Sequence, residues 1–373
     1  MRFVHTADWQ IGKVFKRFGE REALFREARL DVIEALGQLA RREGARHVLV
    51  AGDIYDQHTP LRTTLWAPLE RMRRHPDVIW HLLPGNHDPH RPKGLWEQLA
   101  GDDLPANVRP RLSPHPVEIE PGVFLLPAPL VRRTEPNDLT AWMNQAETPP
   151  GAIRIGLAHG SVTGFDSQGD AGNPIDPARP ARAGLAYLAL GDWHRTLKIG
   201  ERVWYAGTPE PDRSGSQEVG TALVVDVAGA QAPPLVRPES VGTYRWMTRA
   251  MTLGDEASVQ DLEALVRALE ALPRLVLRLD VSGAVSMAAR TALDRTLERL
   301  SAAVCHLDAD LSALQMRPST DDLDGIDFDG ALRRVAQRLQ ARLAEPGLSP
   351  AEQRITQDAL IRLFTLTQAG AAA

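Results

Sequence analysis

The chain has 373 residues, of which 43% are hydrophobic and 24% charged, and its formal net charge is -5. This composition is typical of a globular protein and excludes a disordered or collagen-like chain. The length favours two domains, or one large domain with an appendage. The negative net charge argues mildly against a free-standing nucleic-acid-binding domain, which usually carries a basic field.

Two further features bear on the cellular setting. The single cysteine, Cys305, allows no intramolecular disulfide and gives no basis for a cysteine metal site, which suits a reducing compartment. The first apolar strand begins at Met1, without room for a signal sequence ahead of it, and no apolar run is long enough to span a bilayer. We therefore expect a cytoplasmic protein with no membrane segment.

The first hundred residues alternate predicted strands and predicted helices. This alternation argues for parallel pairing in an α/β sheet. Apolar runs predict strands at residues 1–7, 46–51 and 78–83, and apolar residues at helical spacing predict helices at 20–43 and 61–74.

After residue 105 the predicted strands become short and are separated by proline and glycine. A long loop at 160–184 is expected to be functional or mobile. The paired prolines in 228–242 predict a linker, so that a first domain covers residues 1–235. The predicted strands of this part are 117–119, 123–126, 153–158, 185–190, 203–206 and 224–227.

A small domain at 242–318 follows, with a predicted β-α-β-α pattern. Five aspartates between 321 and 329 are expected to form a solvated hinge. Two amphipathic helices are predicted in the C-terminal region 329–368, with apolar stripes that either dock on a partner or pack on the chain's own core. The stripes are Leu332, Val335 and Leu339 in one helix and Leu360, Leu363 and Leu366 in the other.

Polar residues that suit metal chemistry follow the ends of the predicted strands. Carboxylate, imidazole and amide groups favour Mn, Fe or Zn, and seven such ligands are enough for two ions that share a carboxylate. In the turn Gly85-Asn86-His87-Asp88, His87 would remain free as a general acid, and Asp88 could hold its ring in one tautomer. The seven candidate ligands are Asp8, Gln10, Asp53, Asn86, His159, Asp192 and His194.

Basic residues come soon after several of these strand ends. A basic rim around a cleft can attract a polyanion even when the net charge is negative, although each residue could equally be an ordinary surface charge. The candidate substrate contacts are Lys13, Arg17, Arg91 and Arg195.

The order Asp8-x-Gln10, Gly52-Asp53, Gly85-Asn86-His87-Asp88, His159 and Gly191-Asp192-x-His194 resembles the calcineurin-like metallophosphoesterases. Within them, His5-Thr6-Ala7-Asp8-Trp9, Gly207-Thr208-Pro209 and the small domain after residue 240 most resemble the SbcD-type nuclease subunits of DNA repair complexes. The resemblance implies an α/β (α+β) fold, in which a two-sheet β-sandwich flanked by helices carries a small capping domain and terminal helices.

The same resemblance implies the cofactors and partners. Asp8, Asp53, His194 and residue 10 would hold one divalent ion, and Asp53, Asn86, His159 and residue 192 the other, with Asp53 bridging. Manganese is the expected metal, with Mg, Fe or Zn as alternatives. The implied partners are DNA and an SMC-like SbcC-type ATPase, and a homodimer stays an open alternative.

Two positions depart from the family pattern, which usually has histidine where this chain has Gln10 and Asp192. A neutral amide is a weak ligand and an extra carboxylate favours harder ions, so the metal centre is expected to be weakened. Three function classes follow: a metal-dependent DNA exonuclease or endonuclease, a phosphoesterase acting on small nucleotides or phosphoproteins, and a catalytically weakened scaffold.

Overall fold

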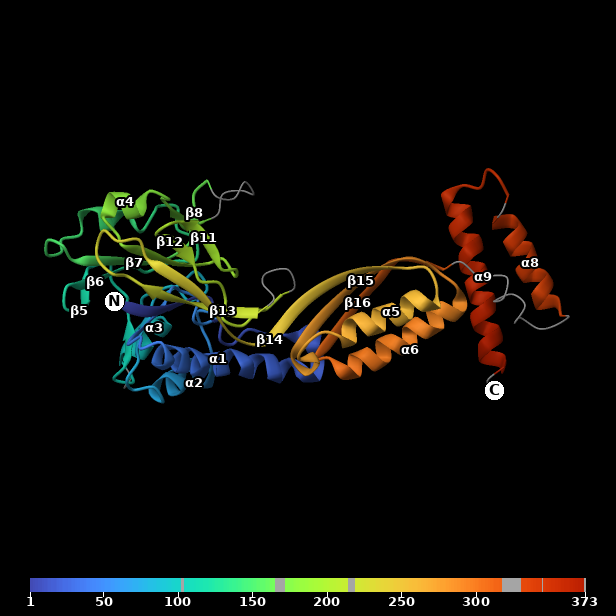
Figure 1. Cartoon of the computed structure of the whole chain (residues 1–373), viewed down its shortest axis with the longest axis horizontal. Helices are drawn as coiled ribbons and strands as arrows, with labels where there is room; N and C mark the ends of the chain where they lie inside the picture. The colour runs from blue at the N-terminus through green and yellow to red at the C-terminus, as the bar shows by residue number, and fades with distance from the viewer. Residues whose placement is uncertain (102–103, 165–171, 214–218, 317–329, 344, 372–373) are drawn as a thin grey trace. The chain divides into compact units, whose positions relative to one another are not determined.

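The computed structural model describes residues 1–101, 104–164, 172–213, 219–316, 330–343 and 345–371. The chain forms two compact units, Met1–Trp246 and Met247–Ala373 (Figure 1). The predicted hinge aspartates at 321–329 lie outside the described residues. Among the described helices, none is long and apolar enough to cross a membrane.

One sheet of the first unit places parallel strands beside one another, as the alternating pattern predicted. Strand β1 pairs in parallel with β2, β2 with β3, and β3 with β4. On its other side β1 pairs antiparallel with β13, which in turn pairs with β14. The bounds are β1 Arg2–Thr6, β2 His47–Val50, β3 Ile79–Leu82, β4 Val108–Pro110, β13 Val219–Asp226 and β14 Leu235–Leu253.

A second sheet has the strand order β11-β12-β10-β7-β6-β5. Its central strands β6, β7, β10 and β12 are parallel, and antiparallel strands close both edges. The bounds are β5 Val117–Glu120, β6 Val123–Ala128, β7 Ile153–His159, β10 Tyr187–Gly191, β11 Leu197–Gly200 and β12 Val203–Tyr205. The described part of the long loop at 160–184 contains two short strands and a short helix, β8 Ser161–Val162, β9 Pro174–Ile175 and α4 Arg179–Ala183.

The two sheets pack face to face, which explains why their strands are apolar on consecutive residues. In β1, Phe3 faces the second sheet while Val4 faces the helices. In β10, Tyr187 lies in the layer between the sheets and Leu188 in the outer layer on the far side. Successive side chains of a strand point to opposite faces, so a strand covered on both faces is buried at every position.

Helices cover the outer face of the first sheet. Helices α1 and α2 lie side by side (Figure 1), and Leu36 of α1 and Leu69 of α2 are fully buried in the same cluster. The bounds are η1 Lys16–Arg21, α1 Glu22–Arg42, α2 Arg62–Arg73 and α3 Leu95–Gly101. The short helix η2 Ala141–Gln145 lies on the second sheet instead, where Met143 is buried with Leu188. The result is the two-sheet sandwich with flanking helices that the resemblance implied.

The second unit adds one strand to the predicted pattern. Helices α5 and α6 pack together and share a core with β15 and β16, and they lie side by side in Figure 1. The strand β16 was not predicted, although its apolar residues alternate with polar ones such as Asp308 and Asp310, as in a half-buried strand. It pairs in parallel with β15 and forms the edge of the sheet. The bounds are α5 Glu256–Arg267, η3 Leu272–Arg274, β15 Leu275–Val285, α6 Met287–Ala303 and β16 His306–Met316.

The predicted linker at 228–242 is wrong from Leu235 onward. There the chain is already strand β14, paired antiparallel with β13 from the register Asp226↔Leu235. Proline is compatible with an edge or with a bulged strand, so the prolines in this stretch did not by themselves indicate an unpaired segment.

The C-terminal helices α8 Ala331–Leu343 and α9 Pro350–Ala371 form a pair with its own small apolar cluster. Ala336 and Leu360 are its buried centre, with Leu339 and Leu363 packed against them. Of the predicted stripes, Leu332 and Val335 remain 41% and 45% exposed. The side chain of Leu366 lies outside the described residues.

Candidate metal centre

Four strand ends bring the candidate ligands together at one edge of the sandwich. The loops after β1 and β2 are joined by hydrogen bonds from the Asp8 amide to the Gly52 carbonyl (3.1 Å) and from the Gln10 amide to the Asp53 carbonyl (2.9 Å). The ends of β7 and β10 are in register, with His159 opposite Gly191. Within each sheet the parallel strands share an edge at their carboxyl ends, which is where such sheets hold ligands. The Asp192 amide donates to Oδ1 of Asp8 at 3.1 Å and so joins the two edges.

The backbone at this edge adopts conformations that side chains usually avoid. Asp8, Gln10, Asp53 and Asp192 all have positive φ angles, of 56°, 46°, 54° and 108°. Such residues are uncommon and concentrate at functional sites, where the surrounding structure holds them in place. Their clustering here marks the edge as a functional site.

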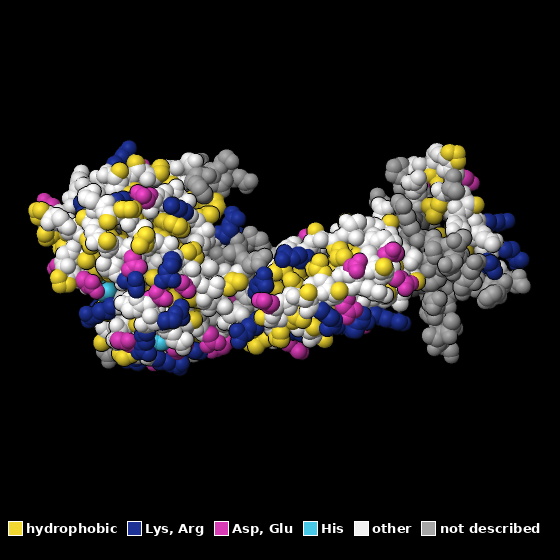
Figure 2. Space-filling view, in the orientation of Figure 1, with side chains coloured by type: hydrophobic (Ala, Val, Ile, Leu, Met, Phe, Trp, Pro, Cys, Tyr) yellow, Lys and Arg dark blue, Asp and Glu magenta, His cyan; other side chains and the backbone are white. Residues whose placement is uncertain are grey.

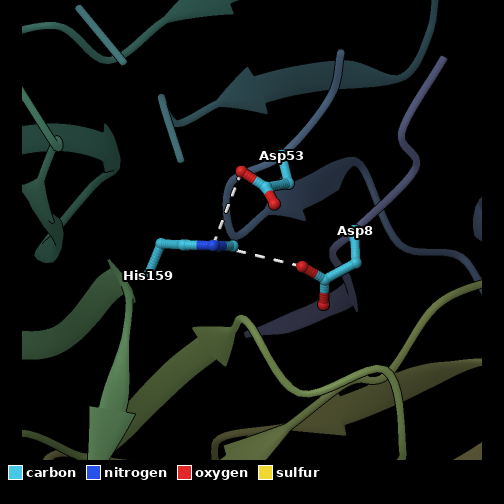
Figure 3. Close-up of side chains that lie close together, drawn as sticks. All are labelled: Asp8, Asp53 and His159. Carbon is cyan, nitrogen blue, oxygen red and sulfur yellow. Dashed lines mark ion pairs between the residues drawn. The ribbon is translucent and has the colours of Figure 1, made fainter. Parts of the chain in front are cut away.

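The His159 ring lies close to the carboxylates of Asp8 and Asp53 (Figure 3). Its Nε2 is 3.5 Å from Oδ1 of Asp53 and 3.7 Å from Oδ1 of Asp192, while Nδ1 is 4.0 Å from Oδ1 of Asp8. Nδ1 donates a hydrogen bond to the Ala51 carbonyl at 2.8 Å. This bond fixes the ring so that Nε2 points toward Asp53 and Asp192, and a metal ion bound there would take the place of the Nε2 proton.

Two buried atoms at this point have no hydrogen-bond partner among the described residues, Nε2 of His159 and Oδ1 of Asn86. Asn86 also donates from Nδ2 to Asp192 Oδ1 at 3.2 Å, so its amide belongs to the same group. Buried polar atoms normally find partners, and imidazole nitrogen, amide oxygen and carboxylate oxygen are all ligands for a divalent ion. Ligand bonds of about 2.0–2.2 Å place ligand atoms roughly 3 Å apart, so only a small contraction is needed. The residues present fit a divalent metal ion.

Three potential ligands form a cluster at this position. Asp8, Asp53 and His159 each offer one ligand atom within 4.8 Å of one another, and all three are buried. Burial raises the pKa of Asp8 to about 6. Burial also opposes the charged form of His159, but Asp53, Asp8 and Asp192 outweigh it and raise the pKa of His159 to about 9. The carboxylates therefore create a strongly cation-attracting position.

His87 lies at the mouth of this group, with its side chain 31% exposed. Its Nδ1 donates to the Asp56 carbonyl at 2.9 Å, and its Nε2 is 4.0 Å from Oδ2 of Asp53. The backbone amide of His87 donates to Asp53 Oδ1 at 2.9 Å. In the protonated ring, Nε2 therefore presents a proton toward the metal-ligand group.

Asp88 has a different set of contacts from the one the sequence suggested. Its Oδ1 accepts from the Gly85 amide at 2.7 Å and its Oδ2 from the Tyr55 amide at 3.0 Å, within a fully buried environment. Burial raises the pKa of Asp88 well above its usual value. These contacts fix the turn that carries Asn86 and His87, whereas the partner of the His87 ring is Asp56.

Gln10 and His194 contact a different set of residues from the His159 group. Gln10 Oε1 accepts a 2.6 Å hydrogen bond from Lys13 Nζ, and Gln10 Nε2 is 3.3 Å from His194 Nε2. Lys13 also pairs with Asp212, whose Oδ2 is 3.3 Å from His194 Nδ1. Burial opposes the charged form of His194, but the bond to Asp212 prevails and raises its pKa.

The other three basic residues predicted to contact the substrate are exposed or half-buried. Arg17 is exposed, stacks on Phe18 and Trp246, and donates from Nη2 to the Asp212 carbonyl at 3.2 Å. Arg195 follows His194 and is exposed, and Arg91 is half-buried in the segment after Asp88.

Three residues of the site were not singled out from the sequence. Asp56 supplies the carbonyl for His87, Asp212 accepts from Lys13 and His194, and Ser161 donates to Asp192 Oδ2 at 2.9 Å. Asp56 lies three residues after Asp53, in the segment Gly52-Asp53-Ile54-Tyr55-Asp56, and its closeness to a predicted ligand could have pointed to it. Neither Asp212 nor Ser161 ends a strand in a way that would have indicated its role.

A two-sheet sandwich with carboxylate, amide and imidazole ligands at its strand ends defines a metal-dependent phosphoesterase. The model of the calcineurin-like phosphoesterase family matches residues 1–195, which is more than half of the chain. The protein therefore belongs to the calcineurin-like phosphoesterases, a family whose members use divalent metal ions.

Within that family, the chain is similar to a nuclease along most of its length. It is 30% identical over 376 residues to the SbcD component of the SbcCD nuclease of Rhodobacter capsulatus, covering 85% of this chain and 86% of that protein. Among solved structures, TT1561 of Thermus thermophilus matches with a TM-score of 0.40 and 12% identity, over 64% of this chain and 98% of that one. At that TM-score the likeness carries no weight for function.

Proposed function

We propose that this protein is a divalent-metal-dependent DNA phosphodiesterase, an exonuclease or endonuclease that serves as the nuclease subunit of an SbcCD-like repair complex. The observation that carries the catalytic part is the pair of buried, unpartnered ligand atoms, His159 Nε2 and Asn86 Oδ1, which have no bond to a described residue and lie beside Asp53 and Asp192. The similarity to the SbcD nuclease component over most of both chains supports DNA as the substrate.

We assign Asp53, Asn86, His159 and Asp192 to hold the ion. Asp8 lies near the other ring nitrogen of His159, Nδ1. When bound, a divalent ion polarises a phosphoryl oxygen and makes water acidic enough to attack it. Manganese is our proposed metal, because mixed nitrogen and oxygen ligands suit it. The sequence predicted two ions, and the contacts of the ligand atoms support the position beside His159.

The chain's own residues would handle the leaving group and its alignment. His87 is placed to protonate the leaving oxygen from Nε2, because its Nδ1 is already bonded to Asp56. Asp88 would act as a positioning residue, since it ties down the turn that holds His87 and Asn86. A general acid of this kind typically contributes about 10²- to 10⁴-fold to the rate.

DNA would be held by basic residues near the strand ends, with Arg17, Arg91 and Arg195 as candidates. On the face drawn in Figure 2, basic and acidic side chains of the first unit are interspersed. Ion pairs such as Arg41–Asp77 and Arg74–Glu34 mix the two charges in the same way. Such mixed charge gives little long-range attraction for a polyanion, so the contacts close to the site would have to provide the binding.

The partner and the cellular setting are further parts of this proposal. An SbcC-type ATPase would dock on the α8–α9 pair, where Leu332 and Val335 are exposed apolar residues. A homodimer and a cytoplasmic location would suit a nuclease of chromosomal DNA. The similarity to a named subunit of a two-component nuclease supports the ATPase partner.

The test is cleavage of labelled single- and double-stranded DNA by the purified protein with Mn²⁺ or Mg²⁺. Asp53→Ala should abolish cleavage, whereas Asp77→Ala, which removes an exposed carboxylate paired with Arg41, should not. Fast hydrolysis of small esters with no salt-sensitive DNA binding would instead identify a small-molecule phosphoesterase. Absence of bound metal and of hydrolysis under any ion would identify a scaffold.

A further inference from the structure

We infer that the ammonium group of Lys13 takes the place of a second metal ion, so that each chain binds one divalent ion, at the His159 group. This inference rests on the proposed function, because it concerns the same centre. It is carried by a difference between two groups of residues: the group around His159 has ligand atoms without a partner among the described residues, whereas the group around Gln10 and His194 already includes the ammonium of Lys13.

On the side of His159, two ligand atoms lack a hydrogen-bond partner among the residues that the structure describes. The Nε2 of His159 and the Oδ1 of Asn86 are buried and have no hydrogen bond to a described residue. Asp53 and Asp192 bring negative charge to within 3.5 Å and 3.7 Å of that Nε2. A divalent ion would bind both unpartnered atoms together with these two carboxylates.

On the side of Gln10, the acceptors are already in contact with a cation. Lys13 Nζ donates to Gln10 Oε1 at 2.6 Å and forms an ion pair with Asp212. The side chain of Asp212 is only 3% exposed, so this carboxylate requires a charged partner. An ion that used the Gln10 oxygen as a ligand would have to displace the ammonium from it.

The local backbone delivers Lys13 to this position. The Lys13 amide donates to the Gln10 carbonyl at 3.1 Å, closing a turn in which Gln10 and Gly12 have φ angles of 46° and 95°. The turn brings the lysine side chain back over Gln10, three residues earlier. Lys13 is therefore positioned by the same strained loop that carries Asp8, and not by the chance conformation of a surface side chain.

The chemistry of Gln10 and His194 agrees with a resident ammonium. Lys13 offers three donors and needs acceptors, and Gln10 Oε1 and Asp212 supply them. His194 is engaged by Asp212 through Nδ1, and its Nε2 is 3.3 Å from Gln10 Nε2. A single positive charge here would lie beside the substrate phosphate and favour it electrostatically, without the Lewis acidity of a metal ion.

The test is metal stoichiometry in the full-length protein, dialysed against Mn²⁺ and then against metal-free buffer, measured by elemental analysis and by electron paramagnetic resonance. We expect one ion per chain and the spectrum of an isolated Mn²⁺ in the wild type. The double variant Gln10→His with Lys13→Ala should gain a second ion and show the spin coupling of two neighbouring Mn²⁺ ions. Lys16→Ala, a matched control on an exposed neighbouring lysine, should retain one ion.

Two ions in the wild type would overturn this inference and leave the proposed function intact. The wild-type measurement decides this even if the double variant does not fold. An unchanged stoichiometry in a folded double variant would also overturn it. A wild type with no ion and no Asp53-dependent hydrolysis would instead overturn the proposed function, so the two failures can be told apart.

Discussion

The turn before Asn86 offers the sharpest test of how the fold positions the metal ligands. Gly85 passes so close to Asp53 that a Cβ atom added there would lie 2.2 Å from Oδ1 of Asp53 and 2.3 Å from its backbone nitrogen. Real Cβ atoms essentially never come closer than 3.0 Å to another heavy atom, so the 2.2 Å separation from the carboxylate oxygen would have to grow to at least 3.0 Å. Because the clash includes backbone, rotation of the Asp53 side chain alone cannot relieve it.

Gly85→Ala should therefore damage the centre without removing any ligand. The displaced carboxylate would lose its 2.9 Å hydrogen bond from the His87 amide and its 3.5 Å approach to His159 Nε2. A shift of about 1 Å can cost roughly 10²-fold in rate, and disturbance of ligand support costs about 10- to 100-fold in metal affinity. Overpacking at a buried site costs about 1–3 kcal/mol of stability.

The assay combines Mn²⁺ titration, hydrolysis of a chromogenic phosphodiester and thermal unfolding. Gly200→Ala is the matched control, since a Cβ at Gly200 meets nothing within 4 Å. We expect the control to match the wild type in all three measurements. A Gly85→Ala protein with wild-type metal affinity and hydrolysis would refute the assignment of Asp53 as a ligand positioned by this turn.

Three other predictions follow from the site and its surroundings. His87→Ala should retain the bound metal and lose about 10²- to 10⁴-fold in hydrolysis, and loss of metal with activity would make His87 a ligand. Burial lowers the pKa of His5 to about 3 from 6.5, so the stability that its neutral ring provides is present above pH 6.5 and is lost as pH falls toward 3. At pH 5 the loss amounts to about 2 kcal/mol. Unfolding of His5→Gln by denaturant should thus depend less on pH between 7 and 5 than that of the wild type, and parallel pH profiles would contradict this. Replacing Leu332 and Val335 together by Asp should abolish co-purification with an SbcC-type ATPase and leave diester hydrolysis unchanged, whereas the equally apolar but unrelated exposed residue Leu61, changed to Asp, should have no effect on either.

The sequence by itself determined which residues could meet. Parallel strands of one sheet place their carboxyl ends at one edge, so the polar residues after β1 and β2 were expected to lie together, as were those after β7 and β10. The packing of the two sheets then brings these two edges together. Asp8, Asp53, His159 and Asp192 do lie together there. The two-sheet sandwich was implied by the order of the motifs and is confirmed by the fold.

Only the tertiary structure decided what each side chain contacts. Lys13 and Asp212 are 199 residues apart, and no local pattern predicts their ion pair. Asp88 follows His87 directly, yet its carboxylate binds the amides of Gly85 and Tyr55. The strand β16 and the strand that replaces the expected linker likewise depend on pairing with distant segments. The direction of a side chain after a tight turn is set by packing and hydrogen bonds across the fold, which sequence spacing does not contain.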